Sequence, residues 1–281
     1  MPTNGFDIIL CPVDFSEISA NALRYAAQLA TCGKGMVVAA YASWFETPPY
    51  FTKSMMEDLQ RQFREAARNA KNSLTSFVKS TLGEAARGVE VRVVDGAPGD
   101  AIQKLAADVH AGLIVMGTHG RTGFNRWMLG SIAERVLRQS VIPVLTVRAG
   151  PRGAMKHILA PVNDTDLSRR ALNVAVELAS CFDATVTALH VQEANGQDPV
   201  VNLCEWIGPE DRSRCKVREL VRHGDPAEEI VTLASETPCD LLVIGAPQRR
   251  FFEGTVLSRT ALRVVRLAPC PVLSISGTRE S

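Results

Sequence analysis

The chain has 281 residues, of which 46% are hydrophobic and 22% charged, with a formal net charge of +1. This composition supports a sizeable buried core and excludes a largely disordered protein, while the near-zero net charge gives no reason to expect binding to nucleic acid or to a membrane surface. No apolar run approaches the ~18 residues of a membrane-spanning helix, and residues 1–7 lack the basic and apolar regions of a secretory signal, so we expect a cytoplasmic protein.

Strand and helix patterns alternate along the first half of the chain. Short apolar runs predict strands at 8–12, 36–42, 89–94, 113–116 and 144–147. Apolar residues at three- and four-residue spacing predict helices between them, the first capped by Ser16 or Ser19 and the others at 57–80, 100–107 and 131–139. Such alternation predicts right-handed βαβ units around a parallel sheet, hence an α/β fold.

The second half of the chain repeats the first. Residues 7–30 and 156–179 share ten identical positions at an offset of 149, and three later blocks recur at an offset of 128. The second copy is therefore shorter in its middle, where an irregular stretch over 193–209 replaces the long helix and is expected to be a loop. We predict two domains, residues 1–148 and 149–281, with the linker at 148–153.

The seven cysteines are odd in number and contain no Cys-x-x-Cys pair. Cys11, Cys239 and Cys270 lie in or beside apolar runs, where a thiol acts as a small hydrophobic group. The pattern predicts unlinked thiols in a reducing compartment. Cys204, Cys215 and His223 match no standard zinc spacing, so no metal site is expected from them.

A glycine motif follows the fourth predicted strand, with the spacing Gly117-x2-Gly120-x9-Gly130-Ser131. Glycines at 117 and 120 permit positive φ and close approach of backbone N–H groups to a phosphate. Gly130 and Ser131 stand where the next helix begins, and its free N–H groups and dipole attract anions. Ser131 and Glu134 fit a capping box at this point. The alternative is a glycine-rich turn with an ordinary helix cap.

Asp14 follows the first predicted strand. In an open parallel sheet, ligands bind outside the carboxyl ends of the strands, where a carboxylate can accept hydrogen bonds from a ribose or an adenine amino group. The alternative is that Asp14 only caps the following helix. His119 lies inside the glycine motif and is either a phosphate contact or a solvated loop residue.

These motifs together resemble the universal stress protein family, and the two copies resemble its tandem type over about residues 5–148 and 155–276. The resemblance implies two open-sheet domains, each with a five-stranded parallel sheet of order 3-2-1-4-5, packed with pseudo-two-fold symmetry. It further implies ATP, with or without magnesium, as ligand of the first domain. The adenosine contacts implied are Pro12, Val13, Asp14, Ala42 and Met116. The phosphate contacts implied are Gly117, Gly120, Arg121, Gly130, Ser131 and Ile132. The final strands, 144–147 and 272–275, are implied to pair across the two-fold axis.

The second copy departs from the glycine motif. By alignment, Gly120 becomes Gln248, Gly130 becomes Ser258 and Asp14 becomes Asn163. Side chains at 248 and 258 block close backbone approach, so we expect this site not to bind ATP in the family's manner. The alternative is an anion held by Arg249, Arg250 and Arg259.

We therefore expect a cytoplasmic ATP-binding regulator of the stress response. The second domain would act as a built-in dimer partner, a homodimer is also allowed, and the protein partner is unnamed. The alternatives are a slow ATPase, for which no catalytic group is evident, and a scaffold that binds no nucleotide or binds another small ligand.

Overall fold

A computed structural model describes residues 6–44, 53–120, 129–151, 153–192, 206, 215–251 and 254–278 of the chain. Within these ranges, none of the helices combines the length and the apolar character needed to cross a membrane. The predicted loop at 193–209 lies outside the described residues except at 206.

The first half forms the alternating strands and helices that the sequence predicts. Its elements are β1 (Ile8–Pro12), α1 (Glu17–Gly33), β2 (Met36–Ser43), α2 (Lys53–Leu82), a 3₁₀ turn η1 (Gly83–Gly88), β3 (Val89–Asp95), α3 (Pro98–Asp108), β4 (Leu113–Gly117), α4 (Ser131–Gln139) and β5 (Val144–Val147). The strands lie in the order β3-β2-β1-β4-β5, all in parallel. This is the predicted order.

The second half repeats this architecture without the long helix. Its elements are β6 (His157–Val162), α5 (Asp166–Phe182), β7 (Thr185–Gln192), β8 (Lys216–His223), α8 (Pro226–Glu236), β9 (Leu241–Phe251), β10 (Gly254–Leu257), α9 (Arg259–Leu267) and β11 (Val272–Thr278). The strand order β11-β9-β6-β7-β8 mirrors that of the first half, and β10 pairs only with β9.

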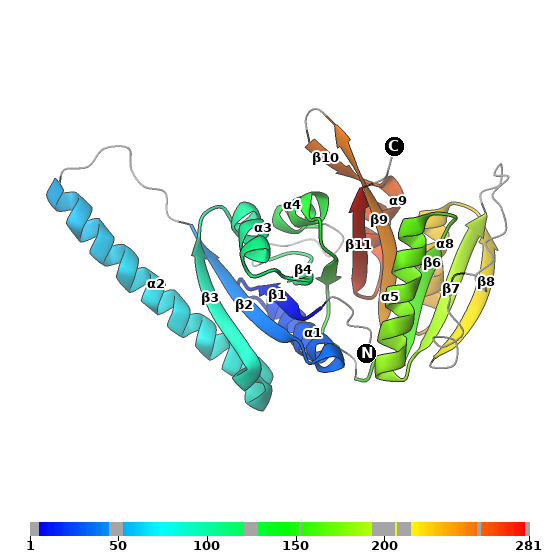
Figure 1. Ribbon diagram of the computed structural model, residues 1–281, viewed down its shortest axis with the longest axis horizontal. Coiled ribbons are helices and arrows are strands. Elements are labelled where there is room, and N and C mark those ends of the chain that lie inside the picture. Colours follow the sequence, from blue (N-terminus) through cyan, green and yellow to red (C-terminus); the bar gives the residue numbers. More distant parts are fainter. Residues whose placement is uncertain are drawn as a thin grey trace.

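The two halves share one continuous sheet (Figure 1). The edge strands β5 and β11 pair antiparallel, with Leu145 opposite Leu273, which confirms the implied pairing of the final strands. Each strand covers the other's exposed edge. One buried cluster on one face of the sheet packs against α1, α2 and α5, and a second on the other face packs against α3, α4, α8 and α9. The sheet is therefore covered on both sides, as a parallel sheet requires.

The first helix of each domain begins and ends in the same way. Ser16 Oγ accepts the backbone N–H of Ser19 at 3.1 Å and so caps α1, and Thr165 caps α5 in the same manner. Both helices end at a residue of left-handed φ, Lys34 and Asp183. Ser16, not Ser19, is therefore the cap.

A disulfide between Cys32 and Cys181 links α1 to α5 (Cα–Cα 5.7 Å). The prediction that the cysteines are unlinked is wrong for this pair. The two residues are 149 positions apart, which is the offset of the repeat. They are therefore equivalent positions, and the symmetry of the two domains brings equivalent surfaces of α1 and α5 together.

Two side chains each cross the domain boundary to meet the end of a helix. Gln248 Nε2 donates to the carbonyls of Leu137 (3.2 Å) and Ser140 (2.7 Å) at the end of α4. In return, Arg148 donates to the carbonyl of Val265 (3.0 Å) and to that of Arg266, at the end of α9. The last carbonyls of a helix lack hydrogen-bond donors within the helix. Each domain therefore supplies a donor to carbonyl groups at the end of a helix in the other domain.

Candidate functional site

The carboxyl ends of β1 and β4 lie side by side in the middle of the first domain's sheet. The strands pair in parallel, with Ile9 opposite Leu113. From β1 the chain continues to β2 and β3 on one side, whereas β4 and β5 lie on the other side. Such a reversal creates the crevice in which open α/β sheets bind their ligands.

Asp14 and Gly120 meet at this crevice. A Cβ atom built on Gly120 would overlap Asp14 Oδ2. The carboxylate after β1 is therefore in direct contact with the glycine segment after β4, although the two residues are far apart in sequence. The structure brings together the two motifs that the sequence treats separately.

The carboxylate of Asp14 is held by Ser16. Asp14 Oδ1 accepts the backbone N–H of Ser16 at 3.1 Å and its hydroxyl at 2.6 Å. Ser16 in turn caps α1. The alternative role of Asp14 as the helix cap is thus wrong, since Asp14 orients the capping residue and places its second oxygen against Gly120.

Phe15, which the sequence analysis did not single out, has a left-handed φ of 65°. A bulky residue in this region costs about 1–3 kcal/mol, and such strain concentrates at functional sites. Its ring packs against Tyr41 of β2 (centroids 4.9 Å apart) and Phe77 of α2 (5.5 Å). These ring contacts hold Phe15 in place and so fix the turn between Asp14 and Ser16.

The glycines of the motif are required by close contacts. Gly117, Gly120 and Gly130 are all described by the structure, and none of them has a positive φ. The prediction that the motif uses glycine for its positive φ is therefore wrong. A Cβ on Gly117 would lie 2.6 Å from Cγ2 of Ile18, and one on Gly130 would lie 3.2 Å from the carbonyl oxygen of Thr118. The segment needs glycine because neighbouring atoms leave no room for a side chain.

The amino end of α4 closes this segment. Gly130 N–H donates to the Thr118 carbonyl at 2.7 Å, so the chain returns to the end of β4. Gly130 occupies the N-cap position and has no side chain with which to cap the helix. The first N–H groups of α4 and the helix dipole are therefore directed at the crevice side of the sheet, an arrangement that suits an anion.

The predicted capping box of Ser131 and Glu134 is wrong. Glu134 instead forms ion pairs with Arg138 (2.6 Å) and, across the domain boundary, with Arg266 (2.8 Å). Burial opposes ionisation of Glu134, but the hydrogen bonds from Arg138 and Arg266 outweigh it and lower the pKa of the carboxyl. Glu134 therefore joins the domains as an anion.

His119 is partly buried at the start of the glycine segment. Its Nδ1 lies 3.0 Å from Thr118 Oγ1, and burial, together with the positive charge of Arg148, lowers its pKa. The ring is therefore mostly neutral at pH 7. If it contacts a ligand, it offers a hydrogen bond and no charge.

The other predicted site residues lie in different environments. Val13 and Met116 are buried in the two core clusters, and Pro12 and Ala42 are half-buried at the ends of β1 and β2. Ser131 and Ile132 are exposed on the first turn of α4. Arg121 lies outside the described residues.

Comparison with known sequences decides the family. The sequence profile of the universal stress protein family matches residues 5–148 and again residues 155–276. The chain belongs to this family. It is a tandem universal stress protein, with two copies of the domain in one chain.

Relatives of both single and tandem type are similar to this chain. A universal stress protein of Methanocaldococcus jannaschii is 30% identical over 145 residues, which cover 52% of this chain and 84% of the relative. A universal stress protein of Mycolicibacterium smegmatis is 26% identical over 95% of this chain and 96% of its own length. The crystal structure of a universal stress protein from Archaeoglobus fulgidus is similar in fold, with a TM-score of 0.73, 20% identity, and coverage of 98% of this chain and 99% of that one.

The second universal stress protein domain replaces the glycine segment with a hairpin. Strand β9 runs on to Phe251 and pairs antiparallel with β10, with Gln248 opposite Leu257. Gln248, at the position of Gly120, is buried and bonded to α4 of the other domain. Ser258, at the position of Gly130, caps α9 with its own side chain. The elements that suit an anion in the first domain are therefore used for folding in the second.

A cleft of about 1210 Å³ remains at the carboxyl ends of β6, β7 and β9. Asn163, in place of Asp14, accepts hydrogen bonds at Oδ1 from Thr165 (2.8 Å) and Ser168 (2.6 Å). The other polar group of the Asn163 side chain is its NH₂ group, which donates hydrogen bonds. The equivalent atom of Asp14 is its second carboxylate oxygen, which accepts them. The polarity at this position is thus reversed between the domains.

His190 also lines this cleft. Its Nδ1 lies 3.1 Å from the Val162 carbonyl, which can only accept, so the geometry assigns the proton to Nδ1. His190 is buried, and within the part of the chain that the structure describes its Nε2 has no hydrogen-bond partner.

No group of three metal-ligating side chains occurs among the described residues. Cys204, one member of the weak zinc pattern considered from the sequence, lies outside them, as do its neighbours in the chain.

Proposed function

We propose that this universal stress protein is an ATP-binding regulator, with one ATP held by the first domain. The contact between Asp14 and Gly120 carries the proposal. It brings a carboxylate, which can accept hydrogen bonds from a ribose or an adenine amino group, against the glycine segment at the switch point of the sheet. The uncapped start of α4 supplies the anion-binding end of the same crevice.

The residues divide by position in the crevice. We propose that the adenosine is held at the ends of β1 and β2 with Met116 as a fixed wall, by Pro12, Val13, Asp14, Ala42 and Met116. The phosphates, with or without magnesium, are then held at the end of β4 and the start of α4, by Gly117, Gly120, Arg121, Gly130, Ser131 and Ile132.

We further propose that residues 1–148 and 149–281 form an intrachain pseudo-dimer in which only the first half binds ATP. The β5–β11 pairing and the ion pair of Glu134 with Arg266 support a fixed arrangement of the two halves. In the second half, Gln248 occupies the place of Gly120 and is itself buried, which supports an ATP stoichiometry of one per chain. A homodimer of the whole chain and an unidentified protein partner remain part of the proposal.

Efficient ATP hydrolysis does not fit this site. A hydrolase needs a base near the γ-phosphate. Glu134, the acidic residue in the first turn of α4, is paired with Arg138 and Arg266, which lower its pKa and so weaken it as a base. We therefore propose a binding protein with at most slow turnover.

One observation favours a second function. The cleft of the second domain is large enough for a small ligand, and it offers the Asn163 amide as a donor. A non-nucleotide ligand in this cleft is the alternative that the structure supports. It is compatible with ATP in the first domain.

Calorimetric titration of nucleotide-stripped protein with Mg-ATP tests the proposal. We expect a stoichiometry of one ATP per chain. Two sites would contradict the asymmetry of the domains, and no binding would remove the nucleotide function and leave the scaffold or the second-domain ligand.

We also propose a cytoplasmic location and a role in the stress response, the latter from family membership. The Cys32–Cys181 disulfide weighs against the location, because disulfides are rare in a reducing cytosol. Cell fractionation, combined with trapping of the thiol state, tests this part.

A further inference from the structure

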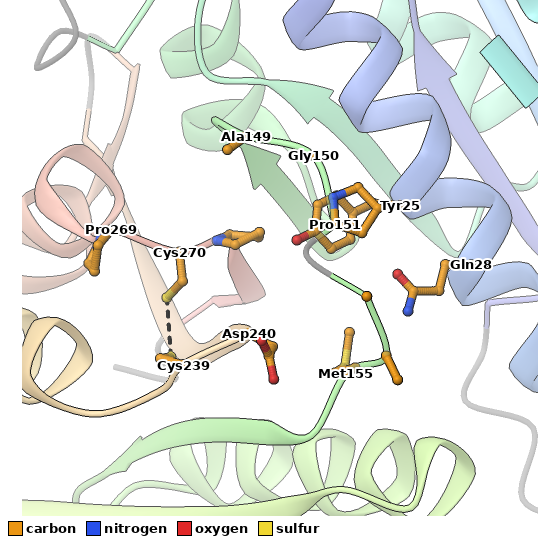
Figure 2. A pocket seen from close by; sticks show the side chains of 13 residues that line it. Tyr25, Gln28, Ala149, Gly150, Pro151, Met155, Cys239, Asp240, Pro269 and Cys270 are labelled. Atoms are coloured by element: carbon orange, nitrogen blue, oxygen red, sulfur yellow. Dashed lines mark hydrogen bonds between the residues drawn. The ribbon is translucent and has the colours of Figure 1, made fainter.

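Two thiols face each other where the linker meets both domains. Cys239 precedes β9 and Cys270 precedes β11, and these strands are parallel neighbours with Val272 opposite Leu242. The two Sγ atoms lie 3.2 Å apart, and the dashed line in Figure 2 marks this contact. This contact has no counterpart in the first domain, where the aligned residues are Ala111 and Ile142.

The two thiols differ in exposure and in hydrogen bonding. Cys239 is half-buried and its thiol donates to the Leu241 carbonyl at 3.5 Å. Cys270 is only 6% exposed. Since the Cys239 proton is directed at a carbonyl, the Cys270 thiol is the donor in the contact between the two sulfurs.

This arrangement separates the roles of the two thiols. The hydrogen bond to Cys239 and burial raise the pKa of Cys270 well above its ordinary value, so Cys270 stays protonated. Because a thiolate is the nucleophile, Cys239 is the thiol that reacts first. The Cys270 S–H group lies within hydrogen-bond distance of the Cys239 sulfur, so the two sulfurs are already in contact.

Only a small movement of the two sulfur atoms separates the dithiol from a disulfide bond. A disulfide has an S–S distance of about 2.05 Å, so the sulfurs need to approach by about 1 Å. A cavity of about 30 Å³ adjoins them, lined by Tyr25 and Gln28 of α1, by linker residues and by the two cysteines (Figure 2). This space is enough for a water molecule, so the two sulfurs are not enclosed on every side by packed atoms.

We propose that Cys239 and Cys270 are a redox-active dithiol, which a small-molecule disulfide such as glutathione disulfide oxidises to an intramolecular disulfide. The Cys239 thiolate attacks one sulfur of the oxidant, and one glutathione thiolate leaves. The departing glutathione thiolate takes the proton of Cys270, whose sulfur attacks Sγ of Cys239, and the second glutathione leaves as a thiolate that water protonates. Two electrons and two protons pass from the cysteines to the oxidant, which is released as two thiols.

The bond would form at a junction of the fold. Asp240, next to Cys239, accepts the backbone N–H groups of Lys156 (2.8 Å) and His157 (3.0 Å), where β6 begins. The dithiol joins the amino ends of β9 and β11, whereas the Cys32–Cys181 disulfide joins α1 to α5 and Asp14 follows the carboxyl end of β1.

Thiol mapping of the full chain tests the proposal. The protein is equilibrated in glutathione buffers from reducing to oxidising, quenched with acid and alkylated, then cut with trypsin, which cleaves between the cysteines at Arg249. We expect the oxidising buffers to yield a Cys239–Cys270 linked peptide pair, with both thiols lost together. Cys11, a buried free cysteine, remains reduced and serves as the internal control.

Single variants test the order of the steps. In Cys270→Ser, glutathione accumulates on Cys239, because no second thiol releases it. In Cys239→Ser, Cys270 stays unmodified. A Cys32→Ser/Cys181→Ser variant that still forms the Cys239–Cys270 bond excludes exchange with the other pair. The proposal is overturned if both thiols are alkylated in the oxidising buffers, or if glutathione attaches to Cys270 in Cys239→Ser.

Discussion

Gln248 of the second domain donates a hydrogen bond of 2.7 Å to the backbone carbonyl of Ser140 in the first domain. By the repeat, Gln248 occupies the position of Gly120, which lies against Asp14 in the candidate site. The same position therefore contacts the Asp14 carboxylate in one domain and ties the domains together in the other. The residue that replaces this glycine in the second copy thus forms hydrogen bonds between the domains.

Replacement of Gln248 with alanine is expected to destabilise the protein. The variant leaves the carbonyls of Leu137 and Ser140 buried without this donor, which costs about 1–3 kcal/mol. Urea unfolding measures the loss. Gln139→Ala, at an exposed position of α4, is the control and should stay within about 0.5 kcal/mol of the parent. Equal stability of the two variants would show that the interdomain bond contributes nothing.

Replacement of Gly120 with alanine is expected to weaken ATP binding at least tenfold, about 1.4 kcal/mol. The added Cβ overlaps the Asp14 carboxylate, so either the carboxylate or the glycine segment has to move. Calorimetric titration with Mg-ATP measures the change. Gly88→Ala is the control, because a Cβ there meets nothing within 4 Å. Parent-like affinity in Gly120→Ala would place the nucleotide elsewhere.

Removal of the disulfide with Cys32→Ser is expected to lower the free energy of unfolding by about 2–4 kcal/mol. The bond closes a loop of 149 residues, so it restricts the unfolded chain strongly. Thermal unfolding with and without dithiothreitol measures the effect. The reductant should lower the Tm of the parent and leave that of the variant unchanged. A parent Tm that does not respond to reduction would contradict the stabilising role.

The interdomain ion pair of Glu134 is expected to give a pH-dependent stability. Its pKa is lowered in the folded state, so the stabilisation is complete above the ordinary value of 4.5 and is lost as the pH falls through the lower folded value. The stability difference between the parent and Glu134→Gln should therefore shrink below pH 4.5 in urea unfolding. Glu84→Gln is the control, since Glu84 pairs with Arg87 at the exposed surface. A difference that stays constant through this range would exclude the linkage.

The sequence by itself determined the elements and the repeat. Apolar periodicity depends on near neighbours in the chain, so it located β1, α4 and β5 at 8–12, 131–139 and 144–147 as the structure has them. Copies at fixed offsets indicated two domains of the same fold, whereas the sheet order came from the resemblance to the family. The glycine spacing predicts where a ligand would approach. These features follow from local rules that hold wherever the segment is placed.

The tertiary structure alone decided the contacts between distant residues. Gln248 and Leu137 are 111 positions apart, and no pattern along the chain shows that they meet. The same holds for the contact of Asp14 with Gly120. It also holds for the hairpin of β9 and β10, which the second domain has at the position of the glycine segment of the first. Even Glu134, whose spacing from Ser131 fits a cap, pairs with Arg266 instead. Local spacing offers a side chain several partners, and the packing of the two domains selects among them by placing one partner in reach.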